Sequence, residues 1–104
     1  MVPARTSSPI PREVSDELGR VVARWHQLPR GRALSGVPAV RELVQSLADE
    51  VARCWGDSLA PLPDLGPATL MNQLEVMVFD LFTGQPETNP AVVTEQLSGI
   101  RRAL

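Results

Sequence analysis

The chain has 104 residues, enough for one hydrophobic core, and its 43% hydrophobic content and formal net charge of −2 are typical of a globular domain. This balance argues against a strongly basic nucleic-acid coat and against a disordered acidic segment. The single cysteine, Cys54, excludes an internal disulfide and a cysteine-based zinc cluster. All ten Lys and Arg positions are arginine, a usage associated with GC-rich bacterial genomes.

Residues 1–9 mix Pro, Ser, Thr and Arg without periodicity, which predicts a disordered tail, whereas residues 10–104 are predicted to form a single helical domain. The tail lacks the apolar run of a signal peptide, and no stretch approaches the roughly 18 apolar residues of a membrane span. We therefore expect a cytoplasmic protein that makes no membrane contact.

The first helix is predicted over residues 11–28, because apolar residues recur there at helical spacing up to Trp25 and Leu28. Pro29 disfavours helix at the residue before it and ends the segment. The following stretch, residues 29–36, has the Pro and Gly content of a loop.

The second helix is predicted over residues 37–55, with Pro38 in its first turn and Gly56 just past its end. Both Trp25 and Trp55 are in phase with the apolar stripe of their helix, so both are expected to be buried. The link from Gly56 to Gly66 contains two Pro and cannot be regular structure, but its leucines could hold it against the bundle.

The third and most apolar helix is predicted over residues 67–83, with Pro67 at its first position and Gly84 as a left-handed stop. At 100° per residue one side of it forms a core face centred on Leu74. The members of this face are Leu70, Leu74, Met77, Val78 and Leu81, and Met71 and Phe82 widen it.

The opposite side of the third helix also carries apolar residues, Val76 and Phe79, next to the polar Asn72 and Glu75. An apolar spot framed by polar side chains is typical of an interaction surface, and we predict that these four residues form a binding site. The alternative is that the first or fourth helix covers this side as well.

The fourth helix is predicted over residues 90–103, with Asn89 as N-cap and Pro90 at the first helical position. No segment alternates with period two, so the predicted fold is all-α. Short links favour neighbours that run in opposite directions, which predicts an antiparallel four-helix bundle.

Catalytic and metal-binding patterns are missing from the sequence. His26 is the only imidazole and has no second ligand or nucleophile nearby in sequence, and Cys54 lies on the apolar stripe of its helix. We therefore expect a protein that is not an enzyme and holds no metal or cofactor.

Basic residues gather in the first half of the chain. Between Glu17 and Glu42 there are five arginines and no acid, and these residues could contact an anionic partner: Arg20, Arg24, Arg30, Arg32 and Arg41. The alternative is that these arginines pair with acids of the same bundle.

Three classes of function stay open. The favoured one is a small helical protein–protein interaction module that binds another protein or itself, as an adaptor, a regulatory subunit or a homodimer. The second is a nucleic-acid-binding accessory protein that uses the arginine-rich segment 20–41, although the acidic second half makes nucleic acid an unfavourable partner. The third is a helical bundle that binds a small ligand.

Overall fold

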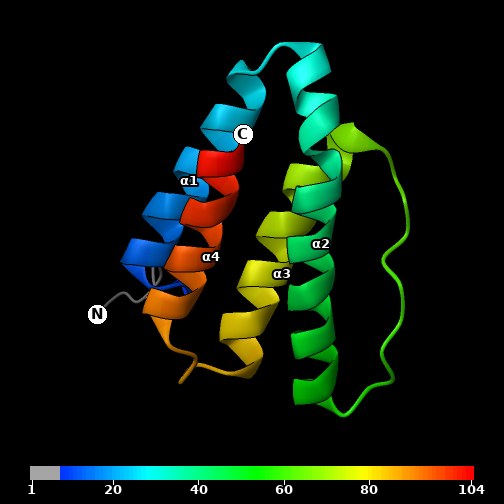
Figure 1. Cartoon of the computed structure of the whole chain (residues 1–104). Helices are drawn as coiled ribbons and strands as arrows, with labels where there is room; N and C mark the ends of the chain where they lie inside the picture. The colour runs from blue at the N-terminus through cyan, green and yellow to red at the C-terminus, as the bar shows by residue number, and fades with distance from the viewer. Residues whose placement is uncertain (1–7) are drawn as a thin grey trace.

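The computed structural model describes residues 8–104 and contains four α-helices (Figure 1). They are α1 (Arg12–Gln27), α2 (Arg30–Trp55), α3 (Leu70–Gly84) and α4 (Pro90–Ala103), and one 3-10 turn, Pro67–Thr69, precedes α3. No strand occurs in the described residues, so the predicted all-α four-helix bundle is confirmed. The tail is predicted over 1–9, and its residues 1–7 lie outside the described residues.

The helices form two pairs, because α1 packs mainly on α4 and α2 mainly on α3 (Figure 1). Successive helices run antiparallel at α1–α2 and at α3–α4, as expected, but α2 and α3 run in the same direction. Their C-terminal ends meet, where the Cys54 Sγ donates a hydrogen bond to the Gly84 carbonyl oxygen at 3.1 Å.

The parallel arrangement of α2 and α3 follows from the link between them, residues 57–66, which we call the strap. Ten extended residues reach about 33 Å, more than the roughly 22 Å length of a 15-residue helix. The strap can therefore return the chain from the end of α2 to the start of α3, as Figure 1 shows. The up-down order expected from short links is wrong at this one link.

The core lies between the two helix pairs and takes side chains from all four helices. α3 contributes the most, because six of its residues are buried: Leu70, Met71, Leu74, Val78, Leu81 and Phe82. The predicted core face of this helix is confirmed except at Met77, which is only partly buried. Trp25 of α1 is also buried, as expected.

The second helix begins seven residues earlier than predicted, at Arg30, so the expected loop 29–36 is wrong and Pro38 lies inside α2. Proline has no N–H, so the turn around Pro38 lacks one helical hydrogen bond. Packing against the ends of α1 and α4 stabilises these first turns. A Cβ on Gly36 would lie 2.7 Å from the Leu104 side chain, so glycine permits the close approach.

Two further expectations are wrong, namely Gly84 as a left-handed stop after α3 and the burial of Trp55 at the end of α2. Gly84 is the last residue of α3 and has no positive φ; a Cβ there would lie 2.9 Å from Trp55 Nε1, so a close contact requires glycine. Trp55 is 60% exposed. The end of α3 contacts Trp55 at Gly84 but leaves most of the indole in solvent.

The third α-helix begins three residues later than predicted, because Pro67–Thr69 form a 3-10 turn before Leu70. The remaining helix ends agree with the sequence. The first helix begins and ends within one residue of its predicted bounds, and the fourth has the predicted bounds. Gly56 adopts the left-handed conformation at φ 74° after α2. The Asn89 side chain accepts a hydrogen bond from the Ala91 N–H at 2.9 Å and caps α4.

No helix in residues 8–104 is long and apolar enough to cross a lipid bilayer.

Candidate functional site

The side of α3 that faces away from the core is exposed, and neither α1 nor α4 covers it. Val76 is 51% and Phe79 is 46% exposed, and Asn72 and Glu75 are exposed beside them. The structure thus brings the four sequence-predicted binding residues to one outer surface. We call this surface the outer face of α3.

An apolar groove lies between the outer face of α3 and the strap. Its volume is about 460 Å³, and eight residues line it: Leu62, Pro63, Leu65, Thr69, Asn72, Gln73, Val76 and Met77. Leu65 of the strap is 60% exposed at its border. The groove therefore extends the apolar surface of Val76 across to the strap.

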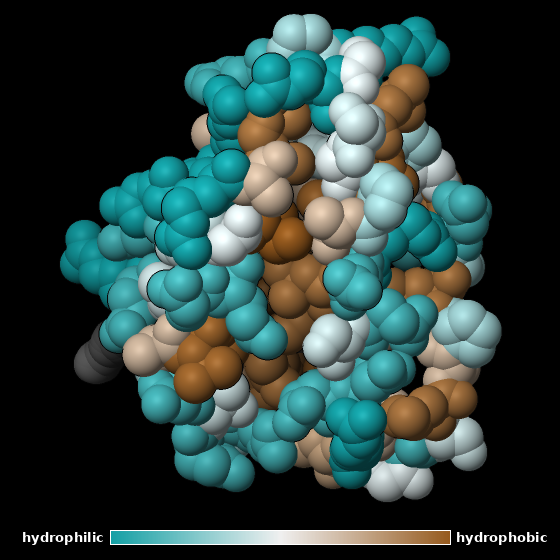
Figure 2. Space-filling view, viewed as in Figure 1, coloured by the Kyte–Doolittle hydropathy of each residue, from teal (hydrophilic) through white to brown (hydrophobic). Residues whose placement is uncertain are grey.

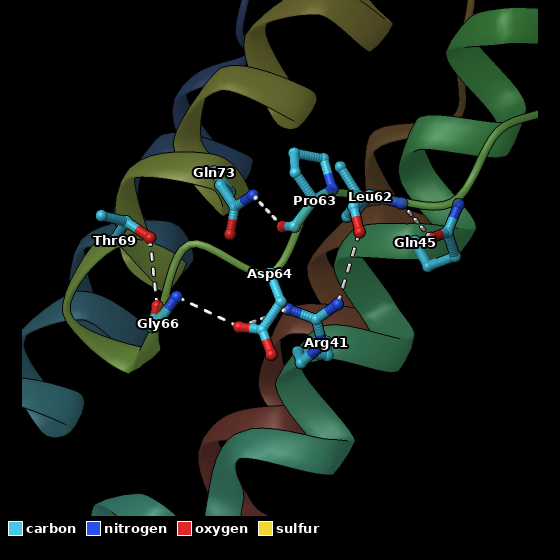
Figure 3. A network of polar contacts seen from close by, with 8 residues as sticks. All are labelled: Arg41, Gln45, Leu62, Pro63, Asp64, Gly66, Thr69 and Gln73. Carbon is cyan, nitrogen blue, oxygen red and sulfur yellow. Dashed lines mark hydrogen bonds and ion pairs between the residues drawn. The ribbon is translucent and has the colours of Figure 1, made fainter.

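Side chains of α2 and α3 hold the strap in place through its backbone (Figure 3). From α3, Gln73 Nε2 donates to the Pro63 carbonyl oxygen at 3.2 Å. From α2, Arg41 Nη2 donates to the Leu62 carbonyl oxygen and Nη1 pairs with the Asp64 carboxylate, both at 3.5 Å. The strap, which forms one wall of the groove, is thus held by polar contacts from both α2 and α3.

Gln45 of α2 makes the most complete contact with the strap. Its Oε1 accepts from the Leu62 N–H at 2.7 Å and its Nε2 donates to the Ala60 carbonyl oxygen at 3.0 Å. One amide thus satisfies a donor and an acceptor two residues apart, as a neighbouring β-strand would. A segment without regular structure needs such partners, because an unpaired backbone group shielded from water is costly.

A second hollow lies between α2 and α4. Figure 2 shows hydrophobic residues along the centre of this side of the molecule, and a furrow of about 320 Å³ is lined there by small residues such as Ala39, Ser46 and Gly99. Its large apolar members, Leu43 and Ile100, are buried or partly buried. An occupant would remove less apolar area from water here than on the outer face of α3.

Four of the five arginines singled out in the sequence contact groups of the same chain. Arg20 Nη1 lies 3.0 Å from a Glu17 oxygen, and Arg24 and Arg32 donate to the Leu104 carbonyl oxygen at 3.3 and 3.1 Å. Arg41 contacts the strap, as described above. Arg30 is exposed at the first position of α2. The five therefore do not form one free basic surface.

Glu17 is the one buried charged residue of the described chain and ties α1 to α4. Desolvation on its own raises the pKa of this carboxyl, but hydrogen bonds from Arg101, Arg20 and Ser98 outweigh it, so the pKa lies below its usual value. Arg101 Nε donates directly to Glu17 Oε2. The cluster has the geometry of an interhelical ion pair.

In the described part of the chain, neither His26 nor Cys54 belongs to a cluster of metal-binding side chains. His26 is exposed near the end of α1, and Cys54 is partly buried with its thiol bonded to the Gly84 carbonyl oxygen. Within residues 8–104, no three side chains that could bind a metal ion come together.

Sequence reasoning did not assign Gln45, Gln73 or Leu65 to a site. Of the leucines expected to hold the strap, Leu62 packs on the core, whereas Leu59 and Leu65 are exposed. Gln45 contacts residues 15 to 17 positions away in sequence, a distance at which no local pattern relates them. Comparisons with models of protein families, with curated proteins and with solved structures find no match.

Proposed function

We propose that this chain is a non-enzymatic, cytoplasmic protein–protein interaction module that binds its partner on the outer face of α3. The observation that carries the proposal is the exposure of Val76 and Phe79 next to the groove that Leu65 borders. Binding sites for proteins contain large apolar side chains surrounded by polar ones.

Nucleic-acid binding has less support, because four of the five candidate arginines have partners within the chain. A small apolar ligand could occupy the groove, whose volume falls in the range of about 300 to 1,000 Å³ that is usual for ligand sites. Such sites enclose most of their ligand, whereas the outer face of α3 is an open surface. A protein partner therefore fits it better.

Site-specific photo-cross-linking in cells of the source organism tests this proposal. A photoreactive phenylalanine analogue replaces either Phe79 or, as control, Val92, which is 54% exposed on α4. We expect a discrete protein adduct from position 79 and none of the same mass from position 92. An excess of unlabelled wild-type chain should suppress the adduct, and the Val76→Glu/Phe79→Glu variant should not.

Equal adducts from both positions, or an adduct that the double variant suppresses as well as the wild type does, would contradict the proposal. Circular dichroism of the double variant checks that it is folded.

A further inference from the structure

The outer face of α3 carries a regular seam of exposed residues. Its members recur at spacings of four, three and four residues, and all of them are exposed: Asn72, Val76, Phe79 and Thr83. This is the spacing of the a and d positions by which two helices pair lengthwise. Over 11 residue steps of about 1.5 Å the seam is about 16 Å long, equal to three turns of a partner helix.

Two carboxylates flank the seam. On a helix that advances 100° per residue, Glu75 and Asp80 lie about 70° to either side of the line through Val76 and Phe79. They thus occupy the g and e positions, whose charges contact the partner helix in lengthwise pairs. Neither forms an ion pair with another residue of 8–104.

The strap and α3, which carries the seam, contain acids and no basic residue of their own. The chain has no Lys, Arg or His between Arg53 and Arg101, a stretch that includes the whole strap and all of α3. Arg41 of α2 reaches the strap, but it pairs with Asp64. On α3 itself the charge beside the seam is therefore negative on both sides.

We infer that the partner segment is a basic amphipathic helix, which places apolar side chains on the seam and Lys or Arg next to Glu75 and Asp80. The inference rests on the proposed function and adds the chemistry of the partner. Opposite charges at flanking positions set partner choice and orientation in paired helices.

Charge disfavours a second copy of this chain as the occupant. In a parallel pair, Glu75 of one copy would face Asp80 of the other, and in an antiparallel pair each carboxylate would face its own equivalent. Both arrangements set like charges against each other, which opposes association. A partner with cations at these positions gains attraction instead.

Fluorescence anisotropy with two synthetic peptides tests the inference on the full chain. Both are 21-residue helices with Leu at positions a and d; one has Lys at e and g, and the other has Glu. At about 50 mM salt we expect the Lys peptide to bind at least about ten-fold more tightly. The preference should shrink at about 0.5 M salt, where screening acts within about 4 Å.

Charge-reversed variants test whether the peptides bind next to Glu75 and Asp80. Glu75→Lys/Asp80→Lys should reverse the preference between the two peptides, and Glu75→Gln/Asp80→Asn, which disturbs folding less, should abolish it. The control Glu42→Lys/Glu87→Lys changes the net charge equally at exposed acids of α2 and of the α3–α4 turn. It should keep the wild-type preference.

Several outcomes would overturn the inference. Equal binding of both peptides, or loss of the preference in the control variant, would show that Glu75 and Asp80 do not select the partner. Failure of both peptides to bind would exclude a basic helix, and a dimer in solution that Phe79→Glu dissociates would make a second copy the occupant. The proposed function itself is decided separately by the cross-linking at position 79.

Discussion

Phe79 and Phe82 lie three residues apart on α3, yet Phe82 is 1% exposed and Phe79 is 46% exposed. Leu74 and Val76 differ in the same way, with exposed fractions of 0% and 51%. One helix thus presents apolar residues to the core and to solvent. On the core side neighbouring helices exclude water, whereas among residues 8–104 the other side has only the strap beside it.

This difference separates the two roles that an apolar side chain can have. A residue on the core side stabilises the fold, because unfolding exposes it to water. A residue on the outer face of α3 is already about half exposed to water in the free chain, so it contributes less to folding, and its exposed area is buried only when a partner covers it. Substitutions on the core side should therefore lower the stability of the fold, whereas substitutions on the outer face of α3 should lower the affinity for a partner.

The largest loss of stability is expected for a substitution on the core side of α3. Leu74→Ala should lower the free energy of unfolding by about 2 to 5 kcal/mol, because it removes buried methyl groups and leaves a cavity that the surrounding helices only partly fill. Urea denaturation followed by circular dichroism measures it. A loss below about 1 kcal/mol would mean that the core side of α3 is not closely packed.

A smaller effect is expected at the strap, which borders the outer face of α3. Gln45→Ala removes two hydrogen bonds to strap backbone groups, and we expect a loss of about 1 kcal/mol, since water can replace part of them. Amide hydrogen exchange at Leu62 should also become faster. Gln96→Ala, at an exposed position of α4, is the matched control and should change stability by less than about 0.5 kcal/mol.

An unchanged exchange rate at Leu62 in Gln45→Ala would contradict the role of Gln45. The strap would then owe its position to Arg41, Gln73 and the partly buried Leu62.

The four-helix fold and both apolar sides of α3 could be predicted from sequence, because helical periodicity determines which residues share a face. Periodicity does not determine how far a neighbouring helix extends. Trp55 is in phase with its stripe and still 60% exposed, although the end of α3 lies beside it at Gly84. The start of α2 was missed for a related reason, since packing around Gly36 and Trp25 outweighs the local effect of Pro38.

The candidate site was predictable only in part. Val76, Phe79, Asn72 and Glu75 follow from the phase of a single helix. The groove depends on where the strap crosses α3, and the strap is positioned by Gln45 and Gln73 through contacts that are distant in sequence. The alternative that another helix covers Val76 and Phe79 could be decided only by the packing of the whole bundle.

The smallest expected change in stability tests the central claim, that the outer face of α3 is a free surface available to a partner. The measurement is the free energy of unfolding of Phe79→Ala, determined by urea denaturation next to Phe82→Ala as the matched control. We expect a loss of less than about 1 kcal/mol for Phe79→Ala and of about 3 to 5 kcal/mol for Phe82→Ala. If Phe79→Ala also loses about 3 to 5 kcal/mol, Phe79 belongs to the core and the account is contradicted.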